Sequence, residues 1–105
     1  MVSNEHRRDP RFSVAMEVTL SSRGQTFTGK ALDLSLGGLR VRFDHDTLPE
    51  PNTELKSHLV FLNGGAADTQ VKVVWAFGRL AGLSFSGPAH PRVMAFTQLE
   101  TRRKN

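Results

Sequence analysis

Apolar and polar side chains alternate with a period of two residues within several short segments of this 105-residue chain. Between Phe12 and Leu20 the even-numbered positions are all large and apolar, and the same period returns between Leu39 and Phe43. A period of two is typical of strands that bury one face and expose the other. Polar, glycine- or proline-containing stretches separate these segments and indicate turns. The sequence therefore predicts six strands, over residues 12–20, 26–34, 39–43, 54–62, 69–77 and 79–85.

Several short strands at this spacing favour a closed or nearly closed antiparallel barrel, because closure leaves no exposed sheet edge. After Pro91 the period changes, and Val93, Phe96 and Leu99 recur every three residues, as in a short amphipathic helix. The expected fold is all-β, a six-stranded antiparallel β-barrel with a short C-terminal α-helix. A chain of this length forms one domain, which we divide into a flexible N-terminal arm (1–11), the barrel (12–86) and the helix (91–103).

Three positions carry specific expectations about packing. Gly29 lies inside the second strand, where a glycine indicates a bulge or a close backbone approach. Trp75 and Phe77 continue the alternation of Val71 and Val73. The pattern therefore predicts that both aromatic side chains lie in the core.

Composition excludes several classes of function. The chain has no cysteine, so it carries no disulfide, no thiolate metal site and no cysteine nucleophile. Its histidines are scattered, and Asp44-His45-Asp46 has no further ligand nearby in sequence, which favours a solvated loop over a metal site. No nucleophile–base set or phosphate-binding loop is evident, so we expect no enzyme, no catalytic residue and no cofactor.

The charge balance points to an anionic partner. Fourteen Lys and Arg residues against ten Asp and Glu residues give a formal net charge of +4. This excess is moderate, and a duplex-DNA binder usually has a denser basic stripe, so DNA is not an expected partner. No run of 18 apolar residues is present, which predicts no membrane insertion and a cytoplasmic location.

Arginines crowd the segment before the first strand, where Arg7, Arg8 and Arg11 fall within five residues. Pro10 disfavours helical geometry at Asp9, so the segment is expected to be an extended arm. Guanidinium groups donate in a planar fork that fits phosphate oxygens, and they stack on flat rings. The same arginines, taken alone, also fit a solvated basic terminus.

A second polar segment lies between the second and third strands and contains Asp33, Ser35, Gly37 and Gly38. A carboxylate can accept two hydrogen bonds from the edge of a guanine, and a serine hydroxyl can donate to an oxygen of a ligand. The glycines permit close approach of a ligand. The alternative interpretation is a capped turn in which Asp33 and Ser35 bond to their own backbone.

Together the two segments resemble the motifs of the PilZ domain family, Arg-x-x-x-Arg before the first strand and Asp-x-Ser-x-x-Gly between the second and third. The resemblance covers nearly the whole chain, including Val73-Val74-Trp75 and Gly82-Leu83-Ser84-Phe85. It implies a receptor for cyclic di-GMP, a bacterial second messenger. The residues implied to bind this ligand are Arg7, Arg8, Arg11, Asp33, Ser35, Gly37 and Gly38.

In that family-based picture the arginines hold phosphates and guanine faces, Asp33 and Ser35 contact guanine and phosphate, and Gly38 keeps the floor of the site open. Ligand binding would order residues 5–11 over the barrel and so change the surface shown to a downstream partner protein. The sequence is compatible with one bound ligand or with an intercalated pair.

Two other functions are compatible with the sequence. One is a PilZ-like interaction adaptor that binds no nucleotide, against which the intact motif residues argue. The other is a general single-stranded nucleic-acid-binding barrel, which needs exposed aromatic side chains along a groove. The aromatic residues of this chain mostly fall on apolar faces, which argues against the second.

Overall fold

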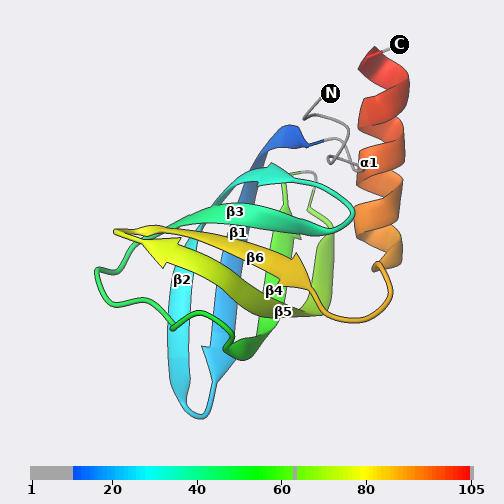
Figure 1. Cartoon of the computed structure of the whole chain (residues 1–105). Coiled ribbons are helices and arrows are strands. Elements are labelled where there is room, and N and C mark those ends of the chain that lie inside the picture. The colour runs from blue at the N-terminus through cyan, green and yellow to red at the C-terminus, as the bar shows by residue number, and fades with distance from the viewer. Residues whose placement is uncertain (1–10, 63, 105) are drawn as a thin grey trace, which may run out of the picture.

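The computed structural model of this chain describes residues 11–62 and 64–104. It is a closed antiparallel barrel with the strand order β1-β2-β3-β6-β5-β4, followed by one helix (Figure 1). This confirms the expected fold class. The elements are β1 (Phe12–Ser22), β2 (Gln25–Leu34), β3 (Gly38–Phe43), β4 (Glu54–Phe61), β5 (Ala66–Phe77), β6 (Leu80–Phe85) and α1 (Pro91–Lys104).

Short turns join the hairpins β1–β2 and β5–β6. The β1–β2 turn has positive φ angles at Arg23 (50°) and Gly24 (83°), and Gly78 in the β5–β6 turn has a φ of 62°. Glycine adopts this region without the steric cost that a side chain brings. The connection between β3 and β4 is longer. It leads to the edge of β1 opposite β2, where β4 pairs with β1 and closes the barrel.

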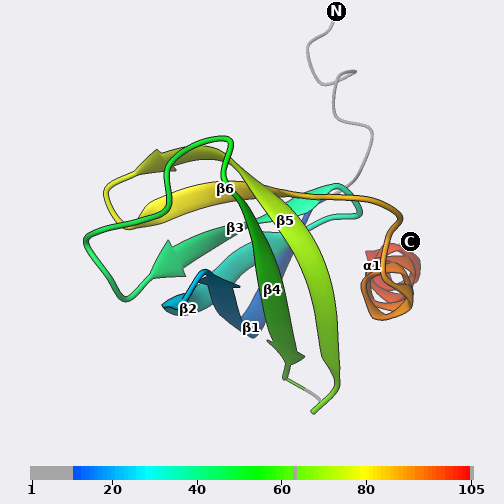
Figure 2. The ribbon, with the colours of Figure 1, turned by 90° about the horizontal axis from the view of Figure 1, so that it is seen from below.

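The alternating apolar residues fill the interior of the barrel, as the two-residue period predicts. Leu20, Val41, Leu59 and Val71 are all fully buried. Helix α1 lies on one side of the barrel (Figures 1 and 2) and adds apolar side chains to this core. Val93 is fully buried, and the ring of Phe96 packs against that of Phe61 with centroids 5.9 Å apart.

The prediction that Trp75 and Phe77 lie in the core is wrong. Val73 pairs with Leu83, but Trp75 pairs with Gly82, so Val74 is an extra residue that forms a β-bulge. The bulge reverses the direction of the side chains that follow it on β5. Trp75 is therefore 40% exposed and Phe77 81% exposed.

The close backbone approach expected at Gly29 is confirmed. A Cβ atom at this position would lie 2.8 Å from the Cα of Phe43 and would contact the carbonyl oxygen of Arg42. Gly29 is paired with Phe43 across the β2–β3 ladder. Glycine at this position therefore lets the two strands close on each other.

Hydrogen bonds to β2 and to Arg79 hold the acidic loop that follows β3 against the barrel. The Oγ1 of Thr28 donates to Asp44, and its backbone N–H donates to the Nε2 of His45, each at 3.1 Å. Arg79 donates to Asp46 at 2.8 Å. Among residues 11–62 and 64–104, no three potential metal-ligating side chains come together, and no helix is both long and apolar enough to cross a membrane.

Ser57 provides a test of core packing. It is 2% exposed on the inner face of β4, and its Oγ has no hydrogen-bond partner among the described residues. Because an unsatisfied buried hydroxyl costs free energy, we expect Ser57→Ala to raise the free energy of unfolding by about 1 kcal/mol. The corresponding rise in Tm is about 4 °C or more, measured by thermal denaturation. Ser13→Ala, at an exposed position of β1, is the control, and an unchanged or lower Tm for Ser57→Ala would contradict the expectation.

Candidate functional site

The centre of the candidate site is Asp33, near the end of β2, where the pairing of that strand is irregular on both sides. Its register with β1 shifts between Ser13 and Met16, and its register with β3 shifts just before Asp33. After the shift Asp33 lies directly opposite Arg40 on β3. The backbone irregularity therefore sets which cation faces this carboxylate.

Two arginines hold the carboxylate of Asp33. Arg11 donates from Nη1 to Oδ1 at 2.8 Å, and Arg40 donates from Nε to Oδ2 at 2.7 Å. The Asp33 side chain is 9% exposed, whereas those of Arg11 and Arg40 are 38% and 48% exposed. One buried carboxylate thus pairs with two guanidinium groups that reach the surface. This cluster of Asp33, Arg11 and Arg40 therefore has a net charge of +1.

The ion pair of Arg11 with Asp33 joins the two polar segments singled out in the sequence. Arg11 comes directly before β1, and Asp33 pairs with Ser13 near the start of that strand. The other two arginines of the arm, Arg7 and Arg8, lie outside the described residues. Among the described residues, the hydrogen bonds that the Asp33 carboxylate accepts come from these two arginine side chains and not from the backbone of its own turn.

Ser35, in contrast, does cap its own turn. Its Oγ accepts hydrogen bonds from the backbone N–H of Gly37 (3.2 Å) and of Gly38 (3.3 Å). Its own N–H donates to the carbonyl oxygen of Gly38 at 2.8 Å, and the residue is buried. The serine therefore fixes the turn between β2 and β3, next to Asp33.

The two glycines of this segment have different surroundings. Gly37 is exposed, whereas Gly38 is buried and pairs with Ser84 on β6. A Cβ atom at Gly38 would collide with the carbonyl oxygen of Leu83. The approach of β3 to β6 thus requires a glycine at position 38 whether or not a ligand is bound.

Two further side chains of this region, Arg40 and Trp75, were not among the site residues predicted from the sequence. The strand register places them in one row across the outer face of four strands, in the order Asp33, Arg40, Gly82, Trp75. The indole of Trp75 covers Gly82, where a Cβ atom would lie only 2.6 Å from Cε2. The outward alternation of Arg40 on its strand was a usable signal, but the bulge hid the exposure of Trp75.

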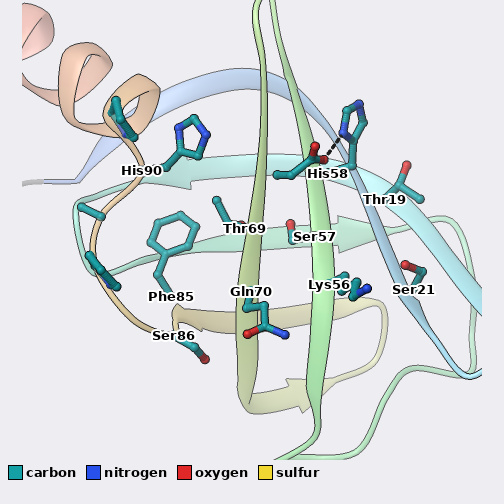
Figure 3. Close-up of a pocket in the computed structure, with 14 residues that line it drawn as sticks. Thr19, Ser21, Lys56, Ser57, His58, Thr69, Gln70, Phe85, Ser86 and His90 are labelled. Carbon is teal, nitrogen blue, oxygen red and sulfur yellow. Dashed lines mark hydrogen bonds and ion pairs between the residues drawn. The ribbon is translucent and has the colours of Figure 1, made fainter.

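A separate hollow of about 800 Å³ lies over β1, β4 and β5 and is bordered by the chain that leads into α1 (Figure 3). Polar side chains such as Lys56 and Gln70 line it, and the Nδ1 of His58 contacts Asp68 at 2.6 Å. None of the predicted site residues that the structure describes lines this hollow. The Asp33 site is instead part of the outer surface of β2 and β3.

Comparisons with known proteins agree with this fold and motif set. No curated protein matches the sequence, but the model of the PilZ domain family matches residues 5–97. The structure is similar to that of the Bacillus subtilis inhibitor of motility MotI/DgrA, with a TM-score of 0.77 and 18% identity over 93% of this chain and 51% of that one. It is also similar to the PilZ domain of CeSA from a cellulose-synthesizing bacterium, with a TM-score of 0.68 and 16% identity over 91% of this chain and 99% of that one.

At these identities the structural likeness shows the fold, and this chain spans about half the length of MotI/DgrA. The family assignment rests on the sequence match, which covers most of the chain and includes both motifs. The chain therefore belongs to the PilZ domain family, a family of cyclic di-GMP receptor domains.

Proposed function

We propose that this domain binds cyclic di-GMP at the Asp33 site and acts as a receptor without catalysis. The observation that carries the proposal is the ion pair of Arg11 with Asp33, in which the last arginine of the arm meets a buried carboxylate. A cyclic dinucleotide with two guanines and two phosphates needs both kinds of group. A carboxylate accepts from the guanine edge, and arginines donate to phosphate oxygens and stack on bases.

The contacts of Asp33 suggest how the ligand enters. The Asp33 side chain is 9% exposed and both of its oxygens bond to arginines, so a guanine edge reaches the carboxylate only where one arginine moves aside. Arg40 is part of β3, whereas Arg11 precedes the first strand. We infer that Arg11 leaves Asp33 and turns to the ligand, with Arg7 and Arg8, while Arg40 keeps its bond to Oδ2.

The proposed output follows from the same exchange. Arm residues 5–11 close over the bound ligand, and the surface that a downstream protein in the bacterial cytoplasm meets is changed. Trp75 lies in the same row as Asp33 and is 40% exposed. Its fluorescence is therefore a convenient reporter of binding, since the chain has one tryptophan.

Isothermal titration calorimetry with cyclic di-GMP tests the proposal. We expect binding by the wild type, a rise in Tm because the ligand favours the folded state, and a loss of about 1.5–3 kcal/mol of binding free energy in Arg7→Ala. Arg23→Ala is the matched control, because it removes an exposed arginine from the β1–β2 turn. No heat and no Tm shift with the wild type would refute the proposed function, and equal affinities of Arg7→Ala and wild type would refute the role of the arm.

Binding of single-stranded nucleic acid is the second candidate, because Trp75 and Phe77 are exposed on the strand face that Arg40 and Arg42 share. Such proteins combine aromatic platforms with a basic groove. A fluorescent dT12 oligonucleotide in competition with cyclic di-GMP separates the two functions. Displacement of the oligonucleotide only by other single strands, with no effect of the cyclic dinucleotide, would favour this candidate.

A further inference from the structure

A second row of side chains runs parallel to the Asp33 row on the outer face of the barrel. Arg42, Leu80 and Phe77 each lie two residues along their strand from Arg40, Gly82 and Trp75, and Lys30 pairs with Arg42. Phe77 is 81% exposed, Leu80 is half-buried, and both cations are exposed. We call this set the β5–β2 row; in order it consists of Phe77, Leu80, Arg42 and Lys30.

The cationic end of the β5–β2 row is not neutralised within the described part of the chain. Lys30 and Arg42 lie directly opposite each other on β2 and β3, an arrangement of like charges that destabilises a sheet. Glu17 lies opposite Lys30 on β1, but no ion pair joins them, and the described residues offer Arg42 no ion-pair partner. Within the described residues, Lys30 and Arg42 thus lie side by side without an ion-pair partner.

The apolar end of the same row is exposed to solvent. Phe77 is 81% exposed, and Val74 and Trp75 on the same strand are 56% and 40% exposed. Large exposed apolar side chains gathered at one place are typical of interaction surfaces. Aromatic residues and arginine are also the residue types enriched in protein interfaces.

We propose that the β5–β2 row is a docking surface for an acidic segment of a partner protein. Carboxylates of that segment pair with Lys30 and Arg42, and a large apolar side chain covers Leu80 and Phe77. Adjacent strands are about 4.8 Å apart, so Arg42 and Phe77 are separated by roughly 10 Å. An extended chain covers that distance in about three residues, which sets the spacing between the acidic and the apolar side chains of the partner.

A peptide segment fits this row better than a nucleic acid. Base stacking along a single strand needs successive open rings, but one face of the Trp75 indole is covered by Gly82. Leu80, which is half-buried in this row, offers aliphatic surface that suits an apolar side chain. The row does not include Asp33 or Arg11, so this docking is separable from ligand binding.

Selection from a random twelve-residue peptide library on the full chain tests the docking surface, with Phe77→Ser protein used for counter-selection. We expect enriched peptides to carry Asp or Glu about three residues from Leu, Ile or Phe. Their affinity, measured by fluorescence anisotropy, should fall at least tenfold in Phe77→Ser and in Arg42→Glu. Lys56→Glu, which reverses an exposed charge on β4, should change it less than twofold.

Several results would overturn the proposal. One is enrichment of peptides without acidic residues, or equal affinity for Arg42→Glu and wild type. Others are tighter binding of dT12 than of any selected peptide, and a homodimer in sedimentation velocity that Phe77→Ser dissociates. All substituted residues are exposed, so the variants should keep the wild-type Tm. Cyclic di-GMP titration of Phe77→Ser is read separately, because its outcome bears on the proposed function and not on peptide docking.

Discussion

Replacing Asp33 by alanine is expected to weaken cyclic di-GMP binding by about 10- to 150-fold, which corresponds to about 1.5–3 kcal/mol. The substitution removes the acceptor proposed for a guanine edge. It also releases Arg40, which bonds to Asp33 at 2.7 Å and is then no longer held in place. Both effects lower affinity, because the site loses a direct contact and the preorganisation of Arg40.

The barrel should survive this substitution. Arg11 and Arg40 are 38% and 48% exposed, so water can solvate their charges once the carboxylate is gone. Asp46→Ala is the matched control, because it removes another carboxylate that binds an arginine at 2.8 Å, at an exposed position. Titration calorimetry of both variants, with Tm measured alongside, decides the matter. Wild-type affinity in a folded Asp33→Ala protein would place the ligand elsewhere.

The strands were predictable because apolar and polar residues alternate with a period of two along most of them. The first segment alternates without interruption, and the structure extends it only to Ser22. The main difference is the start of β5, predicted at Thr69 and observed at Ala66. Alanine and aspartate give no strand signal there, and pairing with β4 as far as Val60–Ala66 extends the strand.

The exposure of Trp75 was not predictable from the two-residue period, because the bulge at Val74 switches the faces of the side chains that follow it on β5. With the register of Val73–Leu83 continued, Trp75 would lie opposite Ala81, but it lies opposite Gly82. A glycine at that position makes room for the indole on the outer face. The bulge is defined by the pairing of β5 with β6, and the alternation within β5 alone does not show it.

The ion pair of Asp33 with Arg40 depends on register in the same way. Ala31 pairs with Val41, so a regular ladder would set Asp33 opposite Leu39. The extra residue, Leu32, shifts the pairing by one and brings Arg40 to the carboxylate. The sequence motifs therefore indicated which residue types form the site. The pairing of Asp33 with Arg40, in contrast, depends on the register of β2 and β3, which the motifs do not show.

Replacing Gly38 by alanine is expected to lower the free energy of unfolding by about 3 kcal/mol, and hence Tm by roughly 10 °C or more. A Cβ atom at this position would collide with the carbonyl oxygen of Leu83 and lie 3.0 Å from the Cα of Ser84. Both are backbone atoms of β6, the strand paired with β3, so no side-chain rotation relieves the contact. The strands have to separate, and the turn that Ser35 caps moves with them.

Gly37→Ala is the control, since it adds the same methyl group at the exposed neighbouring position, and its Tm should stay close to that of the wild type. Thermal denaturation of the two variants without ligand, followed by cyclic di-GMP titration below their Tm, separates two roles for Gly38. A large fall in Tm means that the glycine is needed for the contact of β3 with β6. An unchanged Tm together with lost binding would mean that the ligand, and not β6, requires a glycine there.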